Sequence, residues 1–179
     1  IQGENLTFVG SGATGKFLHT DSTGPGTGTF ITRLLQSGLI TPERRSQYPP
    51  LEALRPLLET PGVVWINLQY DDCREDLARV EREWGVRINT WDGEDLREDL
   101  ESVVGLVAEL DRVVTAATAV SSIAGALGRD TWQLDSGSDW TAFGEPRSPW
   151  FPTIRVVGRR PEEGTWERVM LEARAGLMD

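Results

Sequence analysis

Two short stretches of the sequence have the residue types and spacing of phosphate-binding sites. The first, "FVGSGATGKF", places Gly10, Gly15 and Lys16 at the spacing of a P-loop, in which backbone N–H groups and a lysine hold phosphate. A P-loop also needs a hydroxyl residue after the lysine and a helix behind it, but Phe17 and the breaker-rich "LHTDSTGPGTG" follow. We therefore interpret this stretch as a glycine-rich turn between two strands, which argues against a P-loop nucleotide hydrolase.

The second stretch, "TAATAVSSIAGALG", lies between the apolar segments "LDRVV" and "TWQL". Thr118 is a suitable N-cap, so the N–H groups of Ala119, Val120 and Ser121 would point outward at the carboxyl edge of a sheet, where open sheets bind ligands. Small side chains would let a pyrophosphate approach the backbone, and Gly128 would end the helix in the left-handed conformation. Alternatively, the small residues only let this helix pack closely on the sheet, and the residues alone do not decide between the two.

Composition and charge restrict the remaining functions. Hydrophobic residues make up 39% and charged residues 26%, as in a globular protein, and no apolar run approaches the roughly 18 residues of a membrane span. We expect a cytoplasmic protein, because the first residues also lack the pattern of a signal peptide. A net charge of -10 argues against nucleic acid as a ligand. The single Cys73 and single His19 argue against a disulfide, a metal cluster and a Ser-His pair.

The elements that would position the second stretch alternate between strands and helices. Residues 1–30 are rich in Gly and Thr and predict only short extended pieces and turns of unknown role, whereas residues 31–179 predict one α/β domain. Apolar runs predict strands at residues 63–70 and 86–88, and at "LDRVVT", "TWQL" and "IRVV". The continuous apolar run "VVWINLQY" is typical of a parallel strand buried on both faces.

Helices are predicted between these strands by apolar residues spaced three and four apart. The helix in "DCREDLARVEREWG" would end at Gly85, a long one would begin at Leu96, and the last would begin after Thr165. The inward residues of the last helix are Trp166, Val169, Met170, Ala173 and Leu177. Strands and helices alternating in this way predict an open, doubly wound, Rossmann-like parallel sheet.

From about residue 36 to its end, the sequence resembles the carboxyl-terminal half of bacterial heptosyltransferase-type glycosyltransferases, including versions fused to tetratricopeptide repeats. The resemblance rests on "SGLITPERRSQYPPLEALRPLL", "VVWINLQY", "GEDLREDLESVVGLVAELDRVV", "TAVSSIAGALGRDTW", "SPWFPTIRVV" and "WERVMLEARAGL", in this order. It implies the donor half of a two-domain fold of the GT-B type, binding a nucleoside diphosphate sugar as substrate, with no cofactor and no metal.

The resemblance also implies a set of donor-binding residues. These residues are Ser37, Gly38, Arg44, Arg45, Gln69, Thr118, Ala119, Val120 and Ser122. The last four would contact phosphate, and Ser37 and Gly38 would lie in a loop facing the donor. Arg44 or Arg45 would supply positive charge opposite the diphosphate, which suits an anionic leaving group. Gln69 would lie near the base or the ribose.

The sequence departs from the family pattern at the donor site. Ala117 and Ser122 stand where the family commonly has Asp and His, Leu35 replaces an aromatic residue, and the acceptor-binding half is missing. One hypothesis is a donor-binding domain that transfers a hexosyl or heptosyl group when an acceptor domain completes it, the isolated chain being inactive. The alternative is a noncatalytic, glycosyltransferase-like interaction domain of a repeat protein. Catalytic residues and acceptor are unassigned, and a partner domain or homo-oligomer is a possible complement.

Aromatic residues and the cysteine have two interpretations each. Trp140, Trp150 and Phe151 suit stacking on a base or sugar, but aromatic residues beside prolines more often fill the rim of a sheet, and we expect the second role. Cys73 precedes a helix, a position that can lower a thiol pKa, but it has no base partner.

Overall fold

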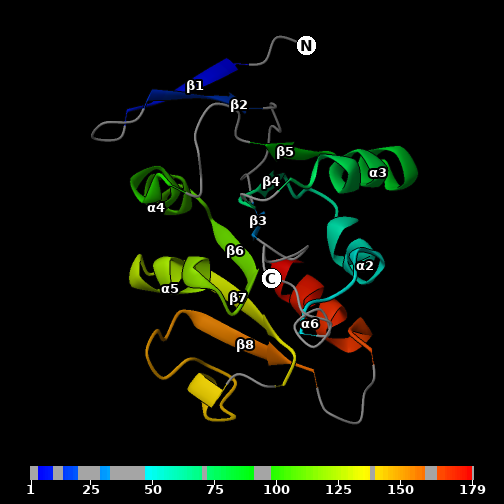
Figure 1. Ribbon diagram of the computed structural model, residues 1–179, viewed down its shortest axis with the longest axis vertical. Helices are drawn as coiled ribbons and strands as arrows, with labels where there is room; N and C mark the ends of the chain where they lie inside the picture. The colour runs from blue at the N-terminus through cyan, green and yellow to red at the C-terminus, as the bar shows by residue number, and fades with distance from the viewer. Residues whose placement is uncertain are drawn as a thin grey trace.

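The computed structural model describes residues 4–9, 14–19, 29–32, 47–69, 72–90, 98–137, 140–159 and 165–178, the first three ranges as backbone only. Six strands form one sheet in the order β5-β4-β3-β6-β7-β8, and every neighbouring pair is parallel (Figure 1). The strands are β3 (Thr29–Thr32), β4 (Trp65–Asn67), β5 (Ile88–Thr90), β6 (Arg112–Ala116), β7 (Asp130–Asp135) and β8 (Ile154–Gly158). The predicted parallel sheet is thereby confirmed.

Helices cover both faces of this sheet (Figure 1). One face carries α4 (Leu100–Ala108) and α5 (Ala119–Ala126). The other carries the 3-10 turn η1 (Leu51–Leu54), α2 (Arg55–Leu58), α3 (Arg74–Trp84) and α6 (Glu167–Met178). The predicted doubly wound α/β architecture is therefore correct. Within the described ranges, no helix is both long and apolar enough to cross a membrane.

The order of the strands reverses between β3 and β6. In chain order the six strands are arranged as third, second, first, fourth, fifth and sixth, which is the strand order of the Rossmann fold. Thr32 at the end of β3 pairs with Thr115 near the end of β6, so both strands stop at the same edge. Because ligands of such sheets bind outside the carboxyl ends at this reversal, the edge beyond Thr115 is the expected binding region.

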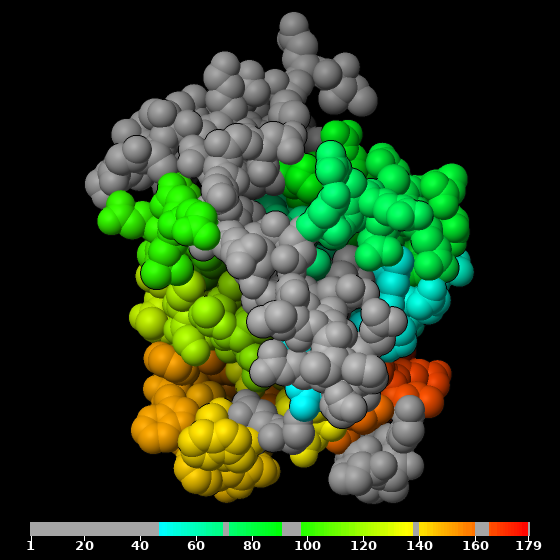
Figure 2. Space-filling view, viewed as in Figure 1, coloured from blue at the N-terminus to red at the C-terminus, as the bar shows by residue number. Residues whose placement is uncertain are grey.

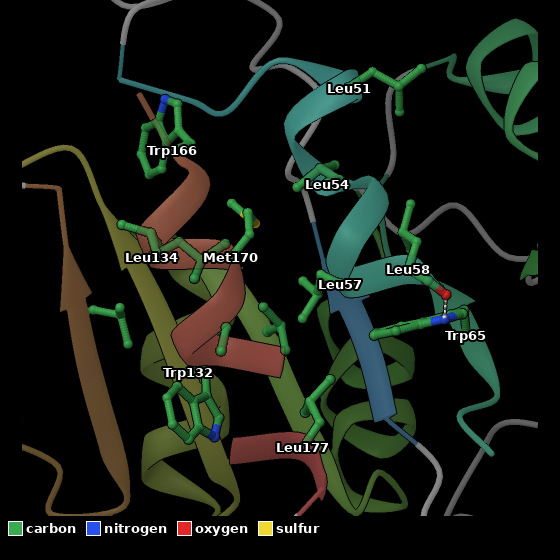
Figure 3. Packing of buried hydrophobic residues seen from close by; sticks show 14 of the residues in the cluster. Leu51, Leu54, Leu57, Leu58, Trp65, Trp132, Leu134, Trp166, Met170 and Leu177 are labelled. Atoms are coloured by element: carbon green, nitrogen blue, oxygen red, sulfur yellow. Dashed lines mark hydrogen bonds between the residues drawn. The ribbon is translucent and has the colours of Figure 1, made fainter. Parts of the chain in front are cut away.

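Two clusters of buried side chains fill the space between the sheet and its helices. On the α6 side, leucines of η1 and α2 belong to one cluster with Trp65, Trp132, Met170 and Leu177 (Figure 3). The Trp65 indole Nε1 donates a 2.8 Å hydrogen bond to the Leu58 carbonyl. All five residues predicted to face inward from the last helix are buried. On the other side, α4 and α5 pack against Val113 of β6. Strand β6 is therefore buried on both faces.

Glycines end two helices as the sequence predicts. Gly85 and Gly128 both have φ between 67° and 69°, the left-handed region that glycine adopts without steric cost. After α5, the N–H of Gly128 bonds to the Gly125 carbonyl and the N–H of Arg129 bonds to the Ala124 carbonyl, which is the Schellman arrangement. The start of α4 is capped by Asp99, whose carboxylate accepts hydrogen bonds from the backbone N–H and the hydroxyl of Ser102.

The amino-terminal strands form a separate hairpin. β1 (Glu4–Val9) pairs antiparallel with β2 (Thr14–His19), in a register that places Lys16 opposite Thr7. Lys16 therefore belongs to a strand and not to a loop that opens a helix, which agrees with our rejection of a P-loop. The strand β3 then begins at Thr29, two residues before the expected start of the α/β domain.

Two strands differ in extent from the prediction. Of the predicted strand 63–70, only Trp65–Asn67 is strand, because the Asn67 side chain bonds to the backbone of Gln69 and turns the chain there. Tyr70 lies outside the described residues. Strand β5 starts at Ile88 and not at residue 86, since Gly85 has reversed the chain and the first pairing to β4 is that of Ile88 with Trp65.

Gly176 tests the packing of α6 on the sheet. A Cβ at this position would overlap the ring of Trp132, so we expect Gly176→Ala to destabilise the fold by about 1–3 kcal/mol. Helix propensity alone predicts the opposite sign, a gain of about 1 kcal/mol. The free energy of unfolding, measured in urea, decides between them. Ala175→Gly at the preceding exposed position reports the propensity effect alone, and a stabilised Gly176→Ala variant would contradict the packing.

Candidate functional site

The candidate site begins at the connection from β6 to α5. Thr118 occupies the N-cap position with extended backbone, at φ -136° and ψ 175°, but its side chain does not cap the helix. The Thr118 hydroxyl instead lies 3.3 Å from the hydroxyl of Thr115, whose Oγ1 also donates to the Ala116 carbonyl. The expected cap position is therefore correct, whereas the expected side-chain role is not, because the hydroxyl pairs with the preceding strand.

The first turn of α5 offers two outward N–H groups. The N–H groups of Ser121 and Ser122 donate to the Thr118 carbonyl at 3.1 and 3.4 Å, and the Ser121 hydroxyl donates to the same oxygen at 2.9 Å. The prediction that Ser121 presents an open N–H is thus wrong, because a tight i to i+3 contact uses this group. Ala119 and Val120 have no partner within the helix by its geometry, so their N–H groups are those available to an anion.

A cavity of about 370 Å³ lies beside this turn, over β7 and β8. It falls within the usual size range of small-molecule sites. Its lining residues come from the start of α5, from the sheet and from residues 141–151 of the β7–β8 connection. They are Ala117, Thr118, Ala119, Ser121, Ser122, Gln133, Thr141, Ala142, Ser148, Trp150, Phe151, Ile154 and Val156.

The electrostatic character of the cavity is neutral. Among the described residues, those that line it carry hydroxyl, amide, aliphatic and aromatic groups and no formal charge. An anion at the turn would therefore rely on the dipoles of the N–H groups and on the amino end of the helix, worth about half an elementary charge. A doubly charged diphosphate would need further positive charge from outside this lining.

Residues 140–153 form a wall of the cavity that is tied to the sheet. The N–H of Ser148 donates to the Ile154 carbonyl and the N–H of Val156 donates to the Pro146 carbonyl, so this segment runs along β8. In Figure 2 the surface of these residues, yellow to orange, lies next to that of α5. A Cβ at Gly125 would lie 2.6 Å from Cγ of Phe151, so only glycine lets Phe151 pack this closely on α5.

The aromatic residues of this wall differ in exposure. Phe151 is half-buried against α5, as expected for a residue that fills the rim of the sheet. Trp140 and Trp150 are 79% and 65% exposed, so the same expectation is wrong for these two indoles. Trp150 lines the cavity, whereas Trp140 is absent from its lining.

Three of the nine predicted site residues line the cavity, and the other six lie apart from it or outside the described residues. Thr118, Ala119 and Ser122 line it, and Val120 packs partly into the core between α4, α5 and the sheet. Gln69 is buried after β4, on the other side of β3 and β6, and does not line the cavity. The remaining four predictions, Ser37, Gly38, Arg44 and Arg45, lie outside the described residues.

The connection after β4 is ordered around Asn67. Its Oδ1 accepts the N–H of Gln69 at 3.0 Å, and its Nδ2 donates to Sγ of Cys73 at 3.2 Å. Beyond it, the Arg74 guanidinium binds both carboxylate oxygens of Asp72, at 2.9 and 2.7 Å, and these hydrogen bonds lower the pKa of Asp72 to about 2. Arg74 is therefore already paired and is a poor candidate for holding a phosphate.

Sequence reasoning missed three polar residues of the cavity. Gln133 is 7% exposed within β7, and Thr141 and Ser148 come from the wall segment. A glutamine inside the apolar strand "TWQL" was a usable signal, because a buried amide needs polar partners. Thr141 and Ser148 gave no comparable signal, since hydroxyl residues are common in loops.

Cys73 has the opposite pKa shift from the one its position suggests. Burial raises the pKa of its thiol, and the charges of Asp72 and Asp76 raise it further, against a lowering by the hydrogen bond from Asn67. The carboxylates and the desolvation outweigh any effect of the following helix, so the thiol is not an activated nucleophile.

Comparisons with known proteins support the fold more strongly than the activity. No protein-family model matches the chain. It is 37% identical over 154 residues to protein FlbA of Caulobacter vibrioides, covering 86% of this chain but only 26% of FlbA. Two structures of the E. coli heptosyltransferase WaaC, one with ADP-2-deoxy-2-fluoro heptose and one with ADP, superpose with TM-scores of 0.59 and 0.57 at 16% and 18% identity. The two superpositions include 88% and 86% of this chain, but only 44% and 46% of the WaaC chains. This chain therefore has the fold of part of a heptosyltransferase.

The contact between Gly125 and Phe151 predicts a specific mutational coupling. Gly125→Ala should destabilise the fold by about 1–3 kcal/mol, because the new methyl group overlaps Phe151. In a Phe151→Ala background the same substitution should cost less, since the contact with Cγ is gone while those with Cβ of residue 151 and Cδ1 of Ile154, both at 2.7 Å, remain. Urea unfolding of the two single variants and the double variant measures the coupling. Additive free energies would show that the two residues do not meet.

The raised pKa of Cys73 predicts low thiol reactivity. At pH 8 the folded protein should react with a disulfide reagent at least about tenfold more slowly than the protein in urea, because the thiolate is scarce and buried. Spectrophotometric release of thionitrobenzoate gives both rates. A folded-state rate equal to or above the unfolded rate would contradict the buried, protonated thiol.

Proposed function

We propose that this chain is the donor-binding domain of a glycosyltransferase and holds a nucleoside diphosphate sugar at the start of α5. The observation that supports the proposal most is the pair of available N–H groups at Ala119 and Val120. They follow β6 at the strand-order reversal and lie beside a polar cavity over β7 and β8. Open α/β sheets place ligands at this point. The shared fold with structures of WaaC that contain ADP or an ADP-heptose analogue supports the same class of ligand.

The diphosphate would lie against the first turn of α5. There the two N–H groups and the helix dipole favour negative charge, and the small side chain of Ala119 lets an oxygen approach the backbone. Since the cavity lining is neutral, the second charge needs a cation, and we assign this role to Arg44 or Arg45. Fixed positive charge would also stabilise the leaving nucleoside diphosphate during transfer.

The nucleoside would extend toward β4 and the sugar toward β7 and β8. Gln69 follows β4 on one flank of the reversal, where we place the base or ribose, and Ser37 and Gly38 would lie in the loop that faces the donor. The cavity lies on the other flank. The diphosphate would therefore bridge the two flanks at Thr118 and Ser122.

A second candidate function is noncatalytic binding, with the domain acting as an interaction module. Ala117 and Ser122 both line the cavity, and neither can act as an acid, a base or a charged ligand of the sugar. Among the described residues, the lining includes no titratable group to activate an acceptor. Transfer would therefore need a base from a partner domain or from residues beyond this lining.

The chain spans about a quarter of FlbA and under half of WaaC, so the activity of the whole protein is part of the proposal. We propose that this chain corresponds to the carboxyl-terminal, donor-binding half of a bacterial, cytoplasmic, tetratricopeptide-repeat glycosyltransferase. An acceptor domain, or a second copy, would complete a hexosyl or heptosyl transferase. The donor base, the sugar and the acceptor are left to experiment.

Replacing Ala119 by proline removes one of the two N–H groups with little expected cost to the helix. Proline is favoured at the first helical position, and the extended backbone of Thr118 suits a residue before proline. We expect a nucleotide chosen from UDP, GDP and ADP to raise the melting temperature of the unchanged protein, adding about 2.7 kcal/mol at 100 times its Kd. Ala119→Pro should lose most of this gain.

Ala119→Ser is the matched control, because it keeps the N–H and changes the side chain by one atom. Arg44→Ala or Arg45→Ala should also reduce the shift, whereas Lys16→Ala should leave it unchanged. If no nucleotide changes the melting temperature at millimolar concentration, donor binding is refuted and the interaction module is favoured. If Ala119→Pro behaves like Ala119→Ser, the diphosphate does not lie on α5.

A further inference from the structure

The rim of the cavity presents an indole whose position is set by several hydrogen bonds. The indole Nε1 of Trp150 donates a hydrogen bond to the Thr141 carbonyl at 3.3 Å. The Ser148 hydroxyl accepts hydrogen bonds from the backbone N–H groups of Trp150 and Phe151, each at 3.3 Å. The ring is nevertheless 65% exposed and lines the cavity. A large aromatic side chain held open in this way leaves a flat apolar face available to a ligand.

We propose that Trp150 stacks on the sugar ring of the donor and that the hydroxyl and amide groups of the cavity bind the sugar's hydroxyls. This inference rests on the proposed function and adds the residue that distinguishes a nucleotide sugar from the bare nucleotide. Trp150 acts in recognition of the sugar and takes no part in bond making.

The chemistry of the lining favours a sugar over a charged group. Ser122 and Ser148 present hydroxyls, and Gln133 adds an amide, all of which suit a ligand with several hydroxyls. An aromatic face beside such groups matches a pyranose, which has polar edges and an apolar face of C–H groups. A phosphate would find no cation among the described lining residues, so within this cavity it suits only the N–H groups at the start of α5.

The position of the cavity supports the same assignment. It lies over β7 and β8, whereas Gln69 follows β4 on the opposite flank of the strand-order reversal. A diphosphate on the turn between Ala119 and Val120 leaves one end of the donor on each flank. With the nucleoside toward β4, the sugar is the end that reaches Trp150.

The wall segment supplies its own matched control. Trp140 is 79% exposed, belongs to the same connection and does not line the cavity. Trp150→Ala should weaken binding of a sugar conjugate by about 2- to 10-fold, the range expected for loss of an aromatic contact, and should leave the nucleoside diphosphate unaffected. Trp140→Ala should change neither. Trp150→Phe should retain much of the affinity, because it keeps a ring.

The experiment uses the full chain and three pairs of probes: UDP with UDP-glucose, GDP with GDP-mannose, and ADP with ADP-glucose. Calorimetry gives Kd for each, and saturation-transfer NMR shows whether protein protons lie near the sugar ring. We expect saturation of the sugar protons in the unchanged protein and in Trp140→Ala, and a weaker saturation, compared at equal occupancy, in Trp150→Ala.

Three outcomes would overturn the inference in distinguishable ways. If no probe of either kind binds, the proposed function fails together with it. If a nucleotide binds but its sugar conjugate binds no differently and the sugar is not saturated, donor binding stands and the sugar site fails. If Trp150→Ala weakens nucleotide and conjugate equally while Trp140→Ala does not, Trp150 contacts the nucleotide part and the assignment of the flanks is wrong.

Discussion

The burial of β6 on both faces is the constraint from which the site follows. Val113 and Val114 are fully buried on opposite faces of this strand, one in each core cluster. Its parallel pairing with β3 and β7 fixes the register of β6. A shift of one residue would move every side chain of β6 to the opposite face of the sheet. The end of β6, and with it the start of α5, is thereby fixed at the carboxyl edge.

Close packing around α5 then shapes the cavity. Gly125 lets Phe151 lie against the helix, and Gly128 ends the helix early enough for β7 to begin at Asp130. The β7–β8 connection is held on the other side by backbone hydrogen bonds that join Pro146, Ser148 and Phe151 to Ile154 and Val156 of β8. A hollow remains between the first turn of α5 and this connection, with the Trp150 indole at its edge. Any larger side chain at Gly125 would push this connection away from α5.

The described residues that line the cavity carry no formal charge, and this has different consequences for ligand binding and for catalysis. Backbone N–H groups at a helix start can hold an oxyanion without any charged side chain, so the proposed donor binding is compatible with Ala117 and Ser122. Proton transfer is different, because it requires a titratable group within hydrogen-bond distance of the acceptor. The same geometry therefore suits a donor-binding half that depends on a partner for chemistry. It also suits a module that has kept the fold of heptosyltransferases and not their reaction.

Local patterns in the sequence determined the alternating elements, the parallel sheet, the glycine helix ends and the inward face of α6, because hydrophobic period and backbone preference are properties of short segments. They also placed Thr118 and Ala119 at a helix start. Only the tertiary structure decided that Ser121 uses its N–H internally, that Gln133 and Ser148 meet across one cavity, that Trp150 stays exposed and that the Cys73 pKa rises. These properties depend on which distant segments pack against a side chain, and packing partners are set by the three-dimensional fold and not by spacing along the chain.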